Sequence, residues 1–473
     1  MEINKYTHTD FNKLDNTLIG QSISIYGRVH NLRKSSANLC FVVLRKRLTT
    51  LQCLCFKKTV GQEKFDILTK LPTETQVILS GKLVALPETQ PIIKSCSYQN
   101  FEFNVDEFEI VSKPVDKLPF QIDDANCLCK DTNENVSEED KRSGVLLKTR
   151  LDSRYFELRT PLNSVIFKLQ SELTNGFRQY LNKQNFVEIH SPKLLGTSSE
   201  SGASVFKFKY FNIDGCLAQS PQLYKQMAIN ADFGKVFEVG PVFRAENSWS
   251  CRHLCEFTGL DIELELDPPF NYKQIIFYLW NVLKSMFDNL ENSSAKEIAY
   301  LKEHHAYENF VLPTDPLIIT FEEGVALLFE NGFDQKLDED LTTQNEKQLG
   351  LIVKQQFNSD LFVLSEYPVQ ARPFYTKRSD NPKFTKSYDI IMRGQEICSG
   401  AQRENDYATL VKQMTELELN LEPFEDYLNS FKTGSPPHGG GGFGLERILM
   451  LYFDLGNVRT TSLFPRDPSR IRP

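Results

Sequence analysis

The chain has 473 residues, of which 40% are hydrophobic and 25% charged, and its formal net charge at pH 7 is −8. This length predicts two or three domains. The sequence has no long apolar run and no apolar leader, so we expect no membrane span and no secretory signal. Ten cysteines without the spacing of a disulfide framework indicate a reducing compartment, and we expect a cytoplasmic protein.

The first part of the chain is typical of a small β-barrel. Residues 1–20 form a short N-terminal segment, and 21–112 carry five runs rich in β-branched and aromatic residues, at 22–32, 39–45, 51–56, 75–86 and 101–112. Five strands in about 90 residues predict a Greek-key barrel of the OB type. Residues 21–60 contain eight Lys or Arg and no Asp or Glu. This concentrated positive charge predicts nucleic-acid binding, with a solvated basic surface as the alternative.

The rest of the chain predicts a hinge and a larger α+β domain. Residues 113–145 are polar, acidic and rich in turn formers, as a linker would be, and the larger domain spans 146–473. Its predicted elements are a helix over 164–185, a strand stopped by Pro192, a helix over 220–232, a strand pair in 384–403, and a glycine-rich turn leading into a helix over 446–455. Helices mixed with antiparallel strands favour α+β over a doubly wound sheet.

Residues 240–265 combine side chains that suit a nucleotide. They are predicted to form two strands around a polar loop, with Arg244 and Glu246 on one face before the loop. After it, one face is expected to carry Phe257, Gly259, Asp261, Glu263 and Glu265, and the other Leu260, Ile262, Leu264 and Leu266. A guanidinium suits phosphate, an aromatic ring stacks on a base, and carboxylates suit a metal or an amine. A solvated strand face carrying charges is the alternative.

Two further motifs are weak when taken alone. The run HGGGGFGLER at 438–447 contains G-x-G-x-x-G, but it lies too near the C-terminus for another βα unit, and the chain has no GxSxG nucleophile elbow. Its glycines allow a close approach of the backbone to a ligand, and Arg447 at the start of the next helix suits a phosphate or a base. Glu396 and Ser399, three residues apart, suit Mg²⁺ bridging phosphates.

In their order and spacing, these segments resemble the class II aminoacyl-tRNA synthetases, and within them the aspartate-specific members of the eukaryotic cytosolic and archaeal type. FVEIHSPKLL is similar to the family's first motif, VFRAE with RHLCEF to the second, and GGGGFGLER to the third. The resemblance implies an N-terminal OB-fold barrel that binds the anticodon and a class II antiparallel-sheet catalytic domain. It also implies an enzyme that activates L-aspartate with ATP to aspartyl-adenylate and transfers the aspartyl group to the 3′ end of tRNA(Asp), releasing AMP and pyrophosphate.

The resemblance assigns roles to individual residues. Arg244 and Arg447 are the implied catalytic residues, Arg244 on the α-phosphate and Arg447 stacked on adenine. The implied ATP contacts are Arg244, Ala245, Glu246, Arg252, His253, Leu254, Phe257, Glu396, Gly444, Leu445, Glu446 and Arg447. The implied aspartate contacts are Glu200, Gln222, Lys225, Arg244, Asp261, Ser399 and Arg403, of which Lys225 and Arg403 clamp the side-chain carboxylate. Glu396 and Ser399 are the implied Mg²⁺ ligands, and Arg33, Phe41 and Gln52 the implied anticodon contacts.

The resemblance also implies a homodimer, with Pro192 at its interface, and leaves other functions open. An asparaginyl-tRNA synthetase would share the fold, but two cations at Lys225 and Arg403 favour a carboxylate over an amide. A lysyl enzyme would need acids at those positions. A tRNA-binding protein without catalytic activity would have lost a catalytic arginine or the Mg²⁺ pair, and all of these are present.

Overall fold

The structure is a computed structural model that describes residues 5–87, 90–128, 144–199 and 205–472. Its described residues fall into two compact units. The first comprises the residues up to 126 together with 155–164, and the second comprises 127–154 and the residues from 165 onward. No helix among the described residues is long and apolar enough to span a membrane.

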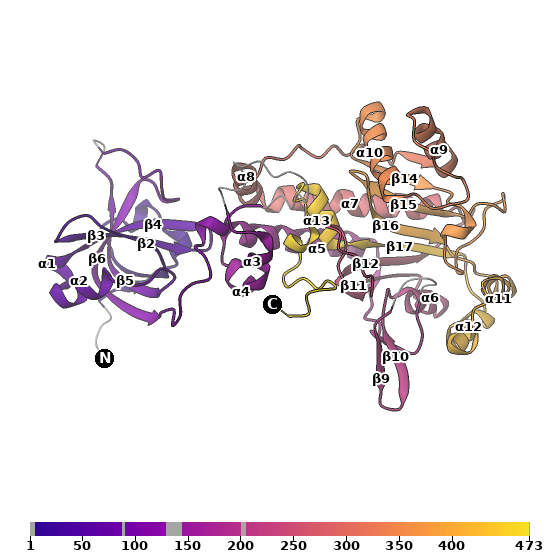
Figure 1. Cartoon of the computed structure of the whole chain (residues 1–473), viewed down its shortest axis with the longest axis horizontal. Coiled ribbons are helices and arrows are strands. Elements are labelled where there is room, and N and C mark those ends of the chain that lie inside the picture. The colour runs from indigo at the N-terminus through magenta and orange to yellow at the C-terminus, as the bar shows by residue number, and fades with distance from the viewer. Residues whose placement is uncertain (1–4, 88–89, 129–143, 200–204, 473) are drawn as a thin grey trace. The chain divides into compact units, whose positions relative to one another are not determined.

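The first unit is a closed β-barrel, as predicted (Figure 1). Its elements are β1 (Thr7–His8), β2 (Ser22–Lys34), β3 (Leu39–Lys46), β4 (Thr49–Phe56), α1 (Lys57–Val60), α2 (Gln62–Leu68), β5 (Gln76–Ala85) and β6 (Phe101–Ser112). The strand order is β1-β2-β3-β4-β6-β5, and an additional pairing of β5 with β2 closes five strands into the barrel. The OB-type prediction is therefore confirmed.

Alternation of buried and partly exposed side chains explains why these segments form a barrel. On β3, Cys40, Val42 and Leu44 are fully buried, while Phe41 and Val43 between them are only half-buried. Because successive side chains of a strand point to opposite faces, one set fills the barrel and the other forms its outer surface.

The predicted basic surface is smaller than the sequence suggested. Arg45 is buried and forms an ion pair with Glu74, with 2.5 Å between Nη2 and Oε1. Arg159 lies 3.3 Å from the other carboxylate oxygen of Glu74, and Arg28 lies 3.8 Å from it. Glu74 lies outside the window 21–60, so the count of charges in that window missed the acid that neutralises part of it.

The second unit contains a mixed, mainly antiparallel eight-stranded sheet with helices packed against it (Figure 1). Its strands are β7 (Val187–Glu188), β8 (Leu194–Leu195), β9 (Lys207–Tyr210), β10 (Ile213–Leu217), β11 (Lys235–Phe243), β12 (Glu256–Glu265), β13 (Ile318–Thr320), β14 (Leu361–Ser365), β15 (Ser387–Met392), β16 (Gln395–Gln402) and β17 (His438–Gly444). The sheet order is β13-β14-β15-β16-β17-β12-β11-β7, and β8-β10-β9 form a separate small sheet. This confirms the α+β class.

The helices of this part of the chain vary from one turn to six. They are α3 (Leu147–Asp152), α4 (Arg154–Glu157), α5 (Pro161–Lys183), α6 (Gln222–Asn230), α7 (Lys273–Ser293), α8 (Ala295–His304), α9 (Phe321–Glu330), α10 (Thr343–Phe357), α11 (Tyr407–Glu416), α12 (Glu425–Lys432) and α13 (Leu445–Tyr452). The long helices α5 and α7 pack closely at Gly176, where an added Cβ would lie 2.8 Å from the Cα of Met286.

The glycine run at 439–444 is a strand, and the predicted turn is wrong. β17 lies inside the sheet between β16 and β12, and both of its faces are crowded. A Cβ at Gly439 would lie 2.3 Å from Ile275 of α7, and a Cβ at Gly440 would lie 2.5 Å from a carboxylate oxygen of Glu263 on β12. The glycines therefore let a helix approach one face of the sheet and buried carboxylates approach the other.

Candidate active site

A cavity of about 280 Å³ in the second unit collects most of the predicted site residues of that unit. It lies over β12, β16 and β17, and the loop after β11, α6 and the start of α13 contribute to its wall. The predicted residues that line it are Gln222, Lys225, Arg244, Glu246, Arg252, His253, Leu254, Phe257, Asp261, Glu396, Ser399, Arg403, Gly444, Glu446 and Arg447. Ala245 and Leu445 do not line it, and Glu200 lies outside the described residues.

One end of the cavity carries the arginine and the aromatic ring predicted for a nucleotide. The backbone N–H of Arg244 donates to the carbonyl of Cys255 at 2.9 Å, which holds the two sides of the loop together. The guanidinium of Arg244 lies 5.5 Å from the ring centroid of Phe257. β11 ends at Phe243, so Arg244 and Glu246 are not on a strand, and that detail of the prediction is wrong. Both residues line the cavity from the loop that follows β11.

The loop between β11 and β12 folds around a histidine. His253 Nδ1 lies 3.0 Å from the Ser248 hydroxyl and 2.5 Å from the Ser250 hydroxyl. Its Nε2 lies 3.8 Å from a carboxylate oxygen of Glu246. Burial, together with the nearby positive charge of Arg447, lowers the pKa of His253. A neutral His253 can bind a phosphate only by donating one N–H, so the positive charge of this end comes from the arginines.

The arginines of this end are fixed by contacts that the sequence did not reveal. Arg447 donates through Nη1 to the carbonyl of Glu396 at 2.7 Å and through Nη2 to the carbonyl of Arg252 at 3.1 Å. Arg252 in turn reaches α10, where Nη1 donates to Glu346 at 2.8 Å and Nη2 donates to the hydroxyl of Thr343 at 2.6 Å. Glu346 also accepts a hydrogen bond from the backbone N–H of Glu396. The surface helix α10 thus supports the nucleotide end.

Glu446 fixes the part of β12 that lines the cavity. Both of its carboxylate oxygens accept from the backbone N–H of Thr258, at 3.1 and 3.0 Å. Burial raises the pKa of Glu446 to about 7, although the N–H of Thr258 favours the ionised form. Because Thr258 follows Phe257, this contact fixes the strand that carries the ring.

The predicted Mg²⁺ pair lies beside a buried ion pair. Ser399 accepts through Oγ from Arg372 Nη1 at 2.8 Å, and Arg372 Nη2 donates to Asp389 Oδ2 at 2.7 Å. Burial and the nearby charge of Asp389 raise the pKa of Glu396 to about 7. Asp389 lies opposite Ser399 in the register of β15 and β16, and its Oδ1 is buried without a hydrogen-bond partner within the described residues.

Asp389 and Arg372 were not predicted, although Asp389 left a signal in the sequence. It is the one acidic residue in the apolar run SYDIIM, which is an unusual position for an acid in a buried strand. The described residues contain no group of three or more His, Cys, Asp or Glu side chains that could hold a metal ion. Glu396 and Ser399 line the cavity, and Asp389 is buried behind Ser399.

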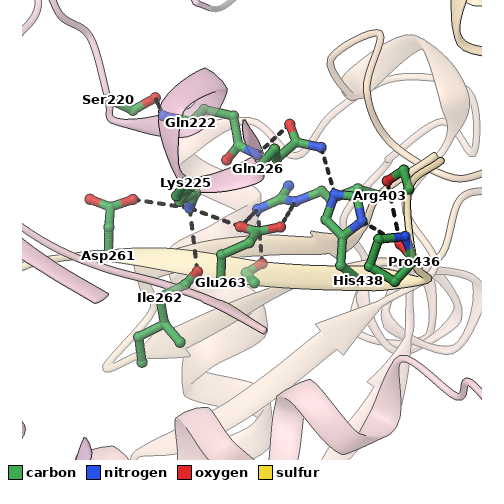
Figure 2. A network of polar contacts seen from close by, with 12 residues as sticks. Ser220, Gln222, Lys225, Gln226, Asp261, Ile262, Glu263, Arg403, Pro436 and His438 are labelled. Atoms are coloured by element: carbon green, nitrogen blue, oxygen red, sulfur yellow. Dashed lines mark hydrogen bonds and ion pairs between the residues drawn. The ribbon is translucent and has the colours of Figure 1, made fainter. Parts of the chain in front are cut away.

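The other end of the cavity holds a buried network of alternating charges (Figure 2). Lys225 Nζ lies 3.2 Å from Asp261 Oδ1 and 3.3 Å from Glu263 Oε2. Arg403 donates to Glu263 through Nε at 2.9 Å and through Nη2 at 3.2 Å, and it also donates to the carbonyl of Gly440 at 3.1 Å. Burial alone would raise the pKa of Glu263, but Arg403 and Lys225 hold it below its usual value.

This network corrects the count of two cations made from the sequence. The predicted pair Lys225 and Arg403 is present, but Glu263 neutralises part of its charge. Glu263 is fully buried, and it was expected on this face of β12 without an assigned role. Lys225 and Arg403 carry two positive charges and Asp261 and Glu263 two negative charges, so the network as a whole is neutral.

The predicted anticodon residues lie together on the outer surface of the barrel. Arg33 and Phe41 are partners in the register of β2 and β3, and the guanidinium of Arg33 lies 5.0 Å from the ring centroid of Phe41. Gln52 of β4 pairs with Val43, so it is a diagonal neighbour of Phe41. Gln52 donates to Glu102, which fixes its amide on the surface.

Comparison with known protein families assigns both parts of the chain. The family described as tRNA synthetases class II (D, K and N) matches residues 147–468, and the OB-fold nucleic acid binding domain matches residues 23–111. Among curated relatives, the aspartate–tRNA ligase, cytoplasmic 1, of Dictyostelium discoideum is 42% identical over 98% of this chain and 85% of its own length.

Solved structures agree with this assignment. The aspartyl tRNA synthetase of Entamoeba histolytica is 36% identical, with a TM-score of 0.87 over 100% of this chain and 94% of that one. The asparaginyl-tRNA synthetase of Pyrococcus horikoshii, complexed with asparaginyl-adenylate, is 26% identical, with a TM-score of 0.83 over 98% of this chain and 99% of that one. Its identity to the aspartate-specific relatives, 42% and 36%, exceeds its 26% identity to the asparaginyl enzyme. The chain therefore belongs to the class II tRNA synthetases (D, K and N), and within them to the aspartate–tRNA ligase branch.

Proposed function

We propose that the protein ligates L-aspartate to tRNA(Asp), with ATP as the energy source. The observation that carries this proposal is the buried network of Lys225, Arg403, Asp261 and Glu263 at one end of a cavity that has the features of a nucleotide site. An α-ammonium group paired with Asp261 would leave Lys225, Arg403 and Glu263 with one net positive charge. Relatives named aspartate–tRNA ligase, cytoplasmic, support the same substrate and a cytoplasmic location.

The chemistry needs positioning and charge stabilisation rather than a nucleophilic side chain. The α-carboxylate of aspartate attacks the α-phosphorus of ATP, pyrophosphate leaves, and the 3′-hydroxyl of the tRNA then takes the aspartyl group from the adenylate. Arg244 neutralises the charge that develops on the α-phosphate. Phe257 and Arg447 hold the adenine between a ring and a guanidinium, Glu246 accepts from its amino group, and Arg252 and His253 contact the outer phosphates.

The donor set at β15 and β16 fits Mg²⁺. Glu396 and Ser399 place hard oxygen ligands at the cavity wall, with the carboxylate of Asp389 opposite Ser399 on the neighbouring strand, and Mg²⁺ commonly takes one or two carboxylates and completes its shell with waters and phosphate oxygens. Bound there, Mg²⁺ would screen the negative charge of the phosphates. Arg372, which donates to both Ser399 and Asp389, orients two of these oxygens.

Charge, and not fold, decides between aspartate and asparagine. An asparaginyl enzyme shares the fold at a TM-score of 0.83, so the architecture is compatible with either amino acid. In a buried site, one net positive charge is compensated by a carboxylate and left uncompensated by an amide. Lys225 and Arg403 would bind the side-chain carboxylate, and Asp261 would accept the α-amino group.

The direct test is pyrophosphate exchange into ATP with each amino acid in turn. We expect exchange with L-aspartate at a kcat/KM at least 10³ times that with L-asparagine, because a buried cation left unpaired costs several kcal/mol. Equal exchange with the two amino acids would contradict the assignment of the pocket. Exchange with asparagine alone would show an asparaginyl enzyme, and binding of tRNA without any exchange would show a protein that no longer catalyses.

The barrel is proposed to bind the anticodon through Arg33, Phe41 and Gln52. Phe41→Ala should raise the KM for tRNA at least fivefold, since a base stacked on an aromatic ring contributes roughly 1–3 kcal/mol. Pyrophosphate exchange should be unchanged, because adenylate formation takes place in the other unit. Tyr26 provides the control: its ring also lies near a cation, 5.5 Å from Lys46, but its strand partner there is Ile78 of β5. An equal loss for Tyr26→Ala would contradict the proposed anticodon surface.

We also propose that the protein acts as a homodimer through the edge of the large sheet. β7 is the edge strand, and Pro192 follows it four residues later. Val187 of β7 is 43% exposed and Leu194 of β8, in the small sheet, is 54% exposed, although both are apolar. An exposed apolar sheet edge is a favourable surface for a second copy of the chain.

A further inference from the structure

Behind the amino acid end of the cavity, polar side chains form a directed chain of hydrogen bonds (Figure 2). Gln222 and Gln226 lie one turn apart on α6, and Nε2 of Gln222 donates to Oε1 of Gln226 at 2.9 Å. The hydroxyl of Tyr427 on α12 donates to the same oxygen at 3.1 Å. Nε2 of Gln226 lies 2.9 Å from Nε2 of His438, the first residue of β17. Only Gln222 lines the cavity; the other three are buried behind it.

The direction of this chain is set at His438. Its Nδ1 lies 2.8 Å from the carbonyl oxygen of Pro436, and a carbonyl only accepts, so Nδ1 carries the hydrogen. Burial lowers the pKa of His438, as do Arg403 and Lys377, while Glu263 opposes them. The imidazole is therefore neutral at physiological pH, and its Nε2 is an acceptor.

An acceptor at His438 fixes each amide in turn. Gln226 must present its nitrogen to His438, which turns its oxygen toward Gln222 and Tyr427. Gln222 must then present its nitrogen to that oxygen. Reversal of either amide would place two donors or two acceptors against each other in a buried site, at a cost of roughly 1–3 kcal/mol.

We propose that Gln226, His438 and Tyr427 are positioning residues that lock the amide of Gln222, with its nitrogen on Gln226 and its oxygen left for the α-ammonium group of the substrate. This inference rests on the proposed function. Gln222 lies one turn of α6 from Lys225, so its amide borders the proposed aspartate site. A reversed amide would exchange that acceptor for a donor at the wall of the site, and a donor repels an ammonium group.

A double-mutant cycle on pyrophosphate exchange tests the relay. Gln226→Met should raise the KM for aspartate about tenfold, the value of one hydrogen bond to a charged group, and should leave the KM for ATP unchanged. In a Gln222→Met background the same change should alter the KM for aspartate less than twofold, because the amide that the relay orients is gone. Independent effects of the two changes would overturn the proposal.

Further variants separate positioning from folding. His438→Gln can keep an acceptor at the position of Nε2 and should retain a near-normal KM for aspartate, whereas His438→Leu should match Gln226→Met. Tyr427→Phe removes only a hydroxyl and should raise the KM two- to threefold. The control is Asn230→Met, because Asn230 bonds Ser430 at 2.9 Å across the same pair of helices, α6 and α12, without reaching the cavity. A control effect equal to that of Gln226→Met would overturn the relay.

The relay and the proposed function fail in different ways. Additive changes, with normal aspartate-dependent exchange in the unmodified protein, would overturn the relay alone. Absence of aspartate-dependent exchange in the unmodified protein would overturn both.

Discussion

Replacement of Arg244 by alanine is expected to lower the kcat of aspartate-dependent pyrophosphate exchange by roughly 10³, the scale of losing one preorganised group that stabilises developing charge. The structure places this guanidinium in the cavity wall, 5.5 Å from the ring of Phe257, with its backbone fixed by Cys255. A cation held there before the reaction needs no reorganisation when charge develops on the α-phosphate, so its loss should affect kcat more than the KM for aspartate.

Arg244→Lys tests whether charge or geometry matters. Lysine keeps the charge but lacks the planar fork that matches two phosphate oxygens, so we expect a loss of roughly 10². Arg378→Ala removes a surface arginine that is paired with Glu416, and it should leave exchange within twofold of the unmodified protein. A loss below tenfold for Arg244→Ala, with a normal unfolding temperature, would contradict a role on the phosphate.

Local patterns predicted which residues share a face, and the structure bears this out on β12. Alternation placed Asp261 with Glu263 and placed Leu260 with Ile262, and these pairs do lie on opposite faces. The same rule failed at Arg244, because the length of a strand depends on its partner, and β12 stops pairing with β11 at Phe243.

Contacts between residues far apart in the chain could not be predicted from the sequence. The pairing of Arg403 with Glu263 joins residues 140 positions apart, and neither one marks the other as its partner in the sequence. The glycine run was misjudged for a similar reason. Glycine usually signals a turn, but at Gly439 and Gly440 it marks a strand whose neighbours lie too close for a Cβ.

The amides of Gln222 and Gln226 show the same limit in another form. Their spacing on α6 was visible in the sequence, but their direction is set by His438, more than 200 positions away. The residue type therefore predicts that a side chain can form a hydrogen bond, while the orientation of its amide is set by the tertiary structure.

Lys225→Met should raise the KM for aspartate roughly 100-fold, about 2.7 kcal/mol, because it removes a buried cation from the proposed carboxylate site. The KM for ATP should change less than twofold, since Lys225 contacts Asp261 and Glu263 at the amino acid end of the cavity, whereas Arg447 belongs to the nucleotide end. Parallel measurements of exchange against aspartate and ATP concentration check both values. Lys354→Met is the control, because Lys354 pairs with a buried carboxylate, Asp360, away from the cavity.

The balance of charge explains why this variant should still fold. Without Lys225, Asp261 loses one ion pair, but Glu263 keeps both of its hydrogen bonds from Arg403, so the central ion pair of the network remains. Glu263→Gln is the opposite case: Lys225 keeps its contact with Asp261, but Arg403 loses the carboxylate that it bonds and faces an amide, which should destabilise the protein by about 3–5 kcal/mol, the cost of breaking a buried ion pair. Bound aspartate supplies a carboxylate to the same cations, so a high aspartate concentration should restore part of that stability. Restoration by asparagine to the same extent would show that the pocket does not read the charge of its ligand.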